Sequence, residues 1–347
     1  MTPRERVLRA ARRQETDRTP LDFSGWQSVV DRLLSDLKLG TREDLLQFLQ
    51  IDIRPVGIGG YTGPQRLTSD GQPADFWGRA GGGGTYADSL GYRPLQNVTT
   101  VDEVYDHPWP NPDDFDYSTV EAQCDQFADY ATRGSSWAPI FCLACDLCGM
   151  ETMLCLMAAE PEIARAILDR ITDVYLGMNE RMFQAANGKL DICFMGDDYG
   201  SQQGLLMKPE TWRSLVKPNL ARLYKHAREH GLVAMHHCCG SIPVIIPDLI
   251  EIGVEILDPI QVRAAGMEPA SLKASFGDSL AFHGAVDTQR TLPFGSPEDV
   301  AEEVRYLIRT LGAGGGYILT GSQELIDDIP TANILAMYQE ALNQPSS

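Results

Sequence analysis

The chain has 347 residues, 43% of them hydrophobic, which is enough to bury one large core. Its 48 acidic and 29 basic residues give a net charge of -19, which argues against nucleic acid and against an anionic membrane surface as partners. Eight scattered cysteines and a beginning without an apolar export signal lead us to expect reduced thiols in a cytoplasmic protein that is not inserted in a membrane.

Short apolar runs of strand length alternate along the chain with longer helical patterns. The runs expected to be strands span residues 20–23, 52–58, 138–144, 191–195, 233–238, 255–260, 280–285 and 316–320. Helices are expected over residues 163–187, 209–230, 242–251, 297–311 and 332–342. Eight strands separated by helices predict an α/β fold, a single closed parallel (β/α)8 TIM barrel with an N-terminal helical extension.

Residues 59–116 interrupt this alternation. The segment is rich in glycine and proline and contains four consecutive glycines at positions 81–84. These glycines lack the preceding strand and the following helix that a phosphate-binding loop requires. We therefore expect a long excursion over the barrel mouth, with a mobile lid or hairpin tip, inside one domain that spans residues 1–347.

Polar residues gather where the predicted strands end. In a parallel barrel these ends face one cavity, and buried acidic or imidazole groups are costly unless they are paired or bind a ligand. The candidates for this cavity are Asp52, Asp197, Asp198, Tyr199, His283, Asp287, Gln323 and Glu324. Structural roles are also open, because Asp197 and Asp198 could cap a helix or pair with an arginine, and His283 could be a hydrogen-bonded core residue.

Two histidines and two cysteines stand next to one another at the end of the fifth predicted strand. Imidazole and thiolate groups are ligands that zinc prefers. Because side chains alternate along a strand, His237 and Cys239 share one face, whereas His236 and Cys238 share the other. Only one of these two pairs can bind a given metal ion.

His226 and His230 form a second pattern with a zinc-like spacing. They lie one helical turn apart, but the predicted helix looks exposed and lacks the intervening glutamate of a metalloprotease. We therefore expect both histidines to be solvated.

A set of short motifs is spread over nearly the whole chain. It comprises residues 4–8, 17–20, Asp52, 196–200, 237–240, 253–259, 284–287, Pro330 and 333–334. Taken together, these motifs resemble the uroporphyrinogen decarboxylase superfamily, in the branch that includes zinc-dependent corrinoid methyltransferases. The resemblance implies a barrel whose active cavity lies at the C-terminal mouth.

The decarboxylases of this superfamily bind a tetrapyrrole through an arginine-rich segment just after the first strand. Residues 21–26 stand in its place here, and the next arginine is Arg32. A substrate with many carboxylates needs such cations, and an acidic mouth would repel it. Decarboxylation by a carboxy-lyase is therefore the alternative rather than the first hypothesis.

The methyltransferases of this branch hold zinc with an HxC pair and a later ligand, and His237 with Cys239 matches that pair. The later ligand is often a cysteine after the eighth strand, but residues 320–324 contain none. The resemblance therefore implies an oxygen donor in its place. The candidates, in order, are Glu324, Gln323, and Asp197 or Asp198.

The functional hypothesis is methyl transfer of the O-demethylase kind. Zinc acts as a Lewis acid on the oxygen of a small methylated substrate, such as a phenyl methyl ether, and a reduced cobalamin takes the methyl group. We expect the corrinoid to be carried by a partner protein, and a homodimer is a further expectation. The residues expected to be catalytic are Asp197, Asp198 and Tyr199, and those expected to bind substrate are Asp52, His283, Asp287 and Gln323. A non-catalytic binding barrel is a second alternative.

Overall fold

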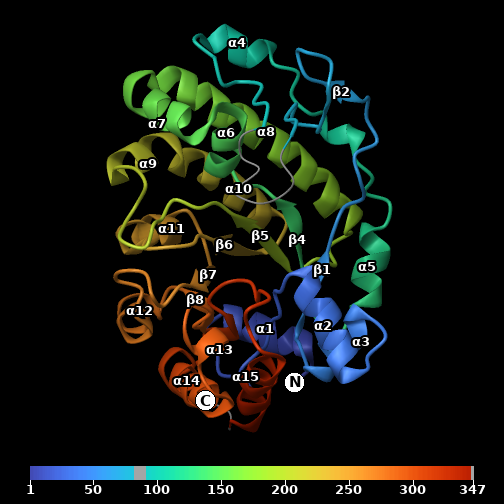
Figure 1. Ribbon diagram of the computed structural model, residues 1–347, viewed down its shortest axis with the longest axis vertical. Helices are drawn as coiled ribbons and strands as arrows, with labels where there is room; N and C mark the ends of the chain where they lie inside the picture. Colours follow the sequence, from blue (N-terminus) through green and yellow to red (C-terminus); the bar gives the residue numbers. More distant parts are fainter. Residues whose placement is uncertain (82–90, 345–347) are drawn as a thin grey trace.

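A parallel sheet of seven strands forms the centre of the molecule. The computed structural model describes residues 1–81 and 91–344. The sheet has the order β1-β4-β5-β6-β7-β8-β9 and curls so that helices cover its outer face (Figure 1). The strands are β1 (Ile53–Val56), β4 (Ala131–Trp137), β5 (Ile192–Gly196), β6 (Val233–His237), β7 (Ile256–Ile260), β8 (Ala281–Val286) and β9 (Tyr317–Gly321).

The eighth position of the barrel is filled by the first predicted run, residues 20–23. Leu21 forms a single parallel bridge to Leu319 of β9. On its other side, the backbone N–H of Asp52, just before β1, donates to the Leu21 carbonyl at 2.9 Å. The segment therefore joins the two edges of the sheet, and the predicted α/β TIM-barrel fold is confirmed.

The third predicted strand, residues 138–144, is wrong, because the strand at this position of the sheet comes earlier in the chain. The strand β4 ends at Trp137, and the run predicted at 138–144 leads into helix α6 (Phe141–Cys148). A short apolar run does not by itself distinguish a buried strand from a buried helix. The strand also carries polar residues, Thr132, Arg133 and Ser135, which weaken its apolar signal.

Helices follow most strands and largely match the expected ranges. The remaining helices are α1 (Pro3–Ala11), α2 (Gln27–Leu37), α3 (Arg42–Phe48), α4 (Val101–Asp106), α5 (Val120–Gln126), α7 (Met150–Ala159), α8 (Pro161–Ala185), α9 (Pro209–Leu215), α10 (Lys217–Glu229), α11 (Ile246–Glu251), α12 (Pro269–Phe276), α13 (Thr291–Phe294), α14 (Pro297–Leu311) and α15 (Thr331–Asn343). The predicted helix 209–230 is divided into α9 and α10, because Pro218 lacks an N–H and starts a new helix. Among the described helices, none alone is long and apolar enough to cross a membrane, and α6 with α7 passes that test only as a pair bent by 108°.

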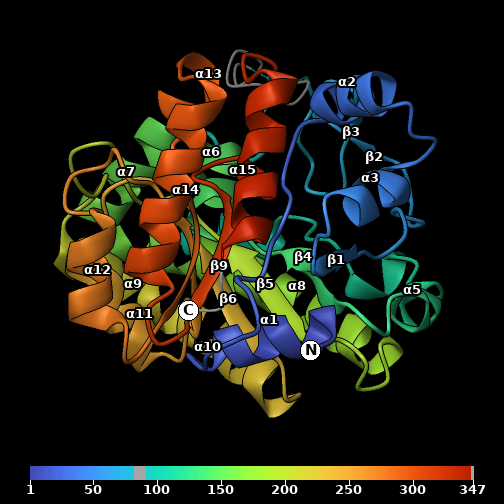
Figure 2. The same cartoon turned by 90° about the horizontal axis from the view of Figure 1, so that it is seen from below.

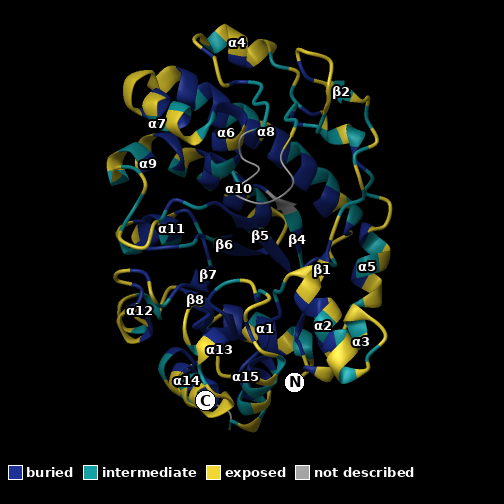
Figure 3. Ribbon diagram, viewed as in Figure 1, coloured by how far each residue is buried: buried dark blue, intermediate teal, exposed yellow. Residues whose placement is uncertain are grey.

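An apolar floor closes the N-terminal end of the barrel. Val7, Ala10 and Ala11 of α1 are buried there, and Figure 2 shows α1 across the lower end of the strands. Every strand of the seven-stranded sheet contributes to this floor. Its strand residues are Ile53, Ala131, Ile192, Val233, Met235, Ile256, Ala281 and Ile318. Figure 3 shows that the strands are buried almost throughout. A second, larger apolar core lies between the sheet and the helices, outside this floor.

The described part of the excursion 59–116 contains little regular structure. It includes the antiparallel pair β2 (Arg66–Leu67) and β3 (Pro73–Ala74), helix α4 and the 3-10 turn Pro112–Asp114. The glycines at 82–84, which belong to the predicted lid tip, lie outside the described residues. That this excursion covers the barrel mouth stays a prediction.

Candidate metal centre

A layer of polar side chains lies directly above the apolar floor. Side chains alternate along a strand, so the residue two positions after a floor residue points into the same interior, nearer the C-terminal end. Applied to β4, β6, β7 and β8, this rule selects one residue from each strand. These residues are Arg133, His237, Asp258 and His283, which we call the polar layer.

Three donor atoms converge at the end of β6. The Nε2 atom of His237 lies 3.1 Å from Sγ of Cys239 and 3.6 Å from Oδ1 of Asp198. All three ligand atoms lie within 4.8 Å of one another, close enough to bind one metal ion. The His237 side chain is 15% exposed and that of Asp198 36%, so solvent reaches the cluster.

The strand register explains why Asp198 belongs to this cluster. Gly196 of β5 pairs with His237 of β6, so Asp198 and Cys239, each two residues further on, come side by side. The Cys239 N–H donates to Oδ1 of Asp198 at 2.8 Å. The oxygen donor beside the HxC pair is therefore Asp198, the last of the candidates considered from the sequence.

Asp258 holds His237 from behind. The two residues are direct partners in the β6–β7 register, and Nδ1 of His237 lies 2.6 Å from Oδ2 of Asp258. An ionised carboxylate only accepts hydrogen bonds, so the neutral His237 ring carries its proton on Nδ1 and its lone pair on Nε2. This arrangement is typical of metal-binding histidines, whose orientation a carboxylate fixes.

The contact continues inward as a buried network. The other oxygen of Asp258 lies 2.5 Å from Nδ1 of His283, whose Nε2 lies 3.0 Å from Asp22. Asp22 in turn forms an ion pair with Arg133. We call Asp258, His283, Asp22 and Arg133 the Asp258 network.

Each charged side chain of the Asp258 network is stabilised by an oppositely charged neighbour. Burial disfavours an ionised Asp258, but His283 and His237 outweigh burial and hold the pKa of Asp258 well below its usual range. Burial is likewise outweighed at Asp22 by Arg133 and His283, which lower the pKa of Asp22. Asp258 also raises the pKa of His237 against the effect of burial, so a metal ion that binds Nε2 must displace a proton from that atom. The network therefore consists of charged groups that depend on one another.

His236 and Cys238 point to the opposite side of the sheet. Nδ1 of His236 lies 2.5 Å from the Tyr224 hydroxyl, and burial lowers the pKa of His236 to about 3. The ring of Tyr199 stacks on His236 with centroids 6.0 Å apart. Tyr199, predicted to be catalytic, therefore lies in the outer core with His236 and outside the donor cluster.

Asp197 caps a helix. Its carboxylate accepts hydrogen bonds from the backbone N–H groups of Ile140, Phe141 and Cys142, at the start of α6. Burial raises the pKa of Asp197 to about 6, although these bonds favour the ionised form. Of the two roles that the sequence left open for Asp197, the structure shows the structural one.

Two other predicted residues lie away from the cluster. Asp52 sits before β1, at the floor end of the barrel, and its carboxylate pairs with Arg6 at 2.6 Å and Arg18 at 2.7 Å. Glu324 accepts hydrogen bonds from Ser24 and from Trp26, at 3.2 Å and 3.1 Å. Neither residue belongs to the groups that could hold a metal among the described residues.

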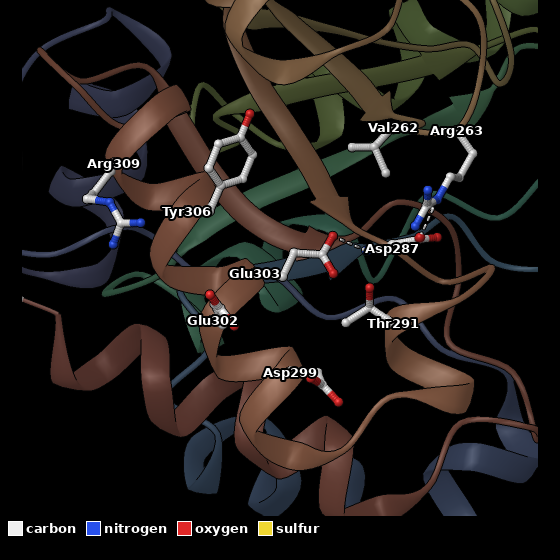
Figure 4. Close-up of a pocket in the computed structure, with 9 residues that line it drawn as sticks. All are labelled: Val262, Arg263, Asp287, Thr291, Asp299, Glu302, Glu303, Tyr306 and Arg309. Carbon is white, nitrogen blue, oxygen red and sulfur yellow. Dashed lines mark hydrogen bonds and ion pairs between the residues drawn. The ribbon is translucent and has the colours of Figure 1, made fainter.

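Asp287 lies in a different pocket from the donor cluster. Its carboxylate accepts from Arg263 at 2.5 Å and from the backbone N–H of Gln289 at 2.8 Å. Figure 4 shows this pocket, of about 510 Å³, with Asp287 beside Arg263. No residue of the donor cluster lines it. Gln323, in contrast, reaches the cluster, because its side-chain amide donates to Sγ of Cys239.

The residues that the sequence did not single out are Asp258, Asp22 and Arg133. Asp258 and Arg133 could have been found by counting two residues from an inward apolar residue, as for His237. Asp22 could not have been found in this way, because residues 20–23 form a single bridge rather than a regular strand.

Comparison with known proteins gives a family and a fold. A model of the family described as Uroporphyrinogen decarboxylase (URO-D) matches residues 117–343. A methylated-thiol--coenzyme M methyltransferase from Methanosarcina mazei is 28% identical over 170 residues, which are 48% of this chain and 42% of that relative. The solved structure of a methyltransferase from Methanosarcina mazei shares the fold, with a TM-score of 0.65, 15% identity and coverage of 98% of both chains.

Proposed function

The chain belongs to the uroporphyrinogen decarboxylase family, and on this basis we propose that it is a zinc-dependent methyltransferase. It would move a methyl group between a small methylated substrate and a corrinoid cofactor carried by a partner protein. The observation that carries the proposal is the donor cluster of Asp198, His237 and Cys239 with Asp258 behind it. The similarity to a methyltransferase that acts on methylated thiols supports the same reaction class.

The donor set fits zinc. Catalytic zinc sites use three protein ligands and leave a fourth position for substrate, and thiolate, imidazole and carboxylate are all accepted ligands. Here they come from Cys239, His237 and Asp198. Bound zinc would supply Lewis acidity toward the atom that carries the methyl group. We propose Asp198 as the oxygen ligand in place of Glu324, whose carboxylate is bonded to Ser24 and Trp26.

The Asp258 network would position the ligands. Asp258 keeps the proton of His237 on Nδ1, so that Nε2 presents its lone pair. His283 and Asp22 hold Asp258 in turn. The Phe194 ring lies edge-on to His237, with centroids 6.2 Å apart, and would exclude water from that side. Asp197 and Tyr199 are assigned no chemical step, because one caps α6 and the other packs on His236.

A methyl ether is the substrate class that we favour. A single thiolate ligand leaves zinc more electrophilic than several thiolates would, which suits an oxygen leaving group. A methylated thiol is the second candidate, favoured by the Methanosarcina relative. Decarboxylation of a polyanion is less well supported, because the arginine of the polar layer, Arg133, is already paired with Asp22.

Metal analysis and turnover test this proposal together. We expect zinc to co-purify with the protein and Asp198→Ala and Cys239→Ser each to lose one equivalent of it, whereas Cys155→Ser, at an exposed cysteine of α7, retains the full content. With cob(I)alamin, methoxylated aromatics should yield methylcobalamin, and methylated thiols would do so if the second candidate is correct. Zinc content that ignores both substitutions would refute the metal site. A zinc-loaded protein that is inactive with every methyl donor would instead favour a binding barrel.

A further inference from the structure

A second group of metal-binding side chains lies on the outside of the barrel, where α8 packs against α10 (Figure 1). Glu180 projects from α8, His226 projects from α10, and His230 is the residue that caps the C-terminal end of α10. Nε2 of His226 lies 2.6 Å from Oε2 of Glu180, and Nε2 of His230 lies 3.5 Å from the same oxygen. The three ligand atoms lie within 4.8 Å of one another.

The helix geometry brings the two imidazoles together. Residues four apart lie on the same face of a helix, and the ring centroids of His226 and His230 are 4.7 Å apart. From the sequence alone these histidines looked solvated, because the third donor comes from a helix 46 residues earlier in the chain. Only the packing of α8 on α10 places Glu180 opposite both rings.

The hydrogen bonds leave a lone pair of His230 facing the carboxylate. Nδ1 of His230 lies 3.1 Å from the backbone carbonyl of His226, which can only accept, so Nδ1 carries the proton. Nε2 of a neutral His230 is then an acceptor that faces Oε2 of Glu180. Two acceptors at this distance repel each other unless a proton or a cation lies between them.

His226 is also free to offer Nε2 to a cation. Without metal, Nε2 of His226 donates to Glu180 at 2.6 Å, so an ion that binds Nε2 displaces this proton. The Nδ1 atom, which is buried and has no hydrogen-bond partner among the described residues, can then carry the proton of the neutral ring. The hydrogen bond from His226 lowers the pKa of Glu180, which favours the carboxylate form of Glu180. All three groups can therefore present electron pairs to one ion.

The neighbouring side chains hold the cluster in place and leave it accessible. The Phe183 ring stacks on His226 and also contacts His230, with centroids 5.4 Å and 5.2 Å away. The amide of Gln184 donates to the second oxygen of Glu180 at 2.5 Å. The side chains of His226, His230 and Glu180 are 17%, 29% and 39% exposed, so an ion can enter from solvent.

We propose that Glu180, His226 and His230 bind a divalent transition metal ion of the zinc class, separately from the cluster at His237. Two imidazoles and a carboxylate suit zinc, nickel or copper, whereas magnesium and calcium prefer oxygen ligands. An ion held there links α8 to α10 and stabilises the folded state, because the unfolded chain does not hold the three donors together.

Cobalt(II) distinguishes this site from the one at His237. Metal-free protein titrated with cobalt(II) should bind two equivalents, and the Cys239 site alone should add thiolate-to-cobalt charge transfer in the near ultraviolet. We expect His230→Ala and Glu180→Gln each to lose one equivalent and to retain the charge-transfer band. Cys239→Ser should do the reverse. Lys225→Ala, at an exposed position of α10, is the matched control and should bind like the unsubstituted protein.

A thermal measurement supplies a second readout. Added zinc should raise the melting temperature of Cys239→Ser, and this rise should vanish when His230→Ala is combined with it. The second site is refuted if His230→Ala and Glu180→Gln bind as many equivalents as the unsubstituted protein, or if the protein binds only the equivalent that Cys239→Ser removes. If the unsubstituted protein binds one equivalent without a charge-transfer band, and His230→Ala removes that equivalent, only the site at His237 is refuted.

Discussion

Replacing Asp258 by asparagine tests the role of the Asp258 network. The carboxylate accepts from Nδ1 of both His237 and His283, at 2.6 Å and 2.5 Å. An asparagine side chain offers one acceptor oxygen and an NH2 donor, so one of the two rings would face a second donor. If that ring is His237, it moves its proton to Nε2 and loses the lone pair that binds the metal.

The expected loss of metal affinity follows from this change. Removing the carboxylate behind a metal-binding histidine typically weakens metal binding about 10–100-fold. This corresponds to about 1.4–2.8 kcal/mol of binding free energy. We expect Asp258→Asn to lie in this range, because Nε2 of His237, Cys239 and Asp198 all remain present. His283→Gln, which leaves the Asp258–His237 contact in place, should cost distinctly less.

The metal-free protein should also become less stable, most strongly at low pH. Asp258 raises the pKa of His283 in the folded state, so its contribution is fully present below the unfolded value of about 6.5 and is lost as the pH rises through the higher folded value. Breaking a buried ion pair costs about 3–5 kcal/mol. We therefore expect a larger loss of unfolding free energy at about pH 6 than at about pH 9.

Competition for zinc with a chromogenic chelator measures the first effect, and urea unfolding of the metal-free protein at both pH values measures the second. The reasoning about the network is refuted if Asp258→Asn retains zinc as tightly as the unsubstituted protein. It is also refuted if the loss of stability is the same at both pH values.

Three further predictions concern residues outside the cluster. Asp52→Asn should lower the unfolding free energy by about 3–5 kcal/mol in urea, because Arg6 and Arg18 lose a buried partner, while zinc content stays unchanged. Burial lowers the pKa of His107 to about 4, so the free energy of unfolding should fall by up to about 3 kcal/mol as the pH falls from about 6.5 to 4. His107→Leu should flatten this pH dependence, and an unchanged pH profile in that variant would contradict the prediction. Glu324→Gln should leave zinc content unchanged, and a loss of zinc would restore Glu324 as the ligand.

The sequence was sufficient for the barrel and for two of the three donors of the cluster. Alternation along one strand separates His237 and Cys239 from His236 and Cys238, and the structure shows the two pairs on opposite sides of the sheet. The third donor could not be chosen in this way. Asp198 meets Cys239 because Gly196 pairs with His237, and a single sequence does not reveal that register between strands.

Helix capping across the chain explains another difference. The run at 138–144 resembles a strand, yet its second half is the first turn of α6, whose N–H groups are satisfied by Asp197 from a different strand end. The residues of the run itself do not reveal this long-range contact, so local propensity could not predict the helix. The same contact engages the carboxylate of Asp197, so the misplaced strand and the capping role of Asp197 have one cause.

The apolar floor, to which α1 contributes, limits the directions from which reactants can enter the barrel. Because Val7, Ala10 and Ala11 fill the N-terminal end of the barrel, the described residues leave His237 open to solvent from the opposite end. Under the proposed function, the methyl donor and the methyl acceptor would then share one entrance. The small molecule would enter first and the larger protein that carries the corrinoid would close over it, so the first helix of the chain would set the order of binding.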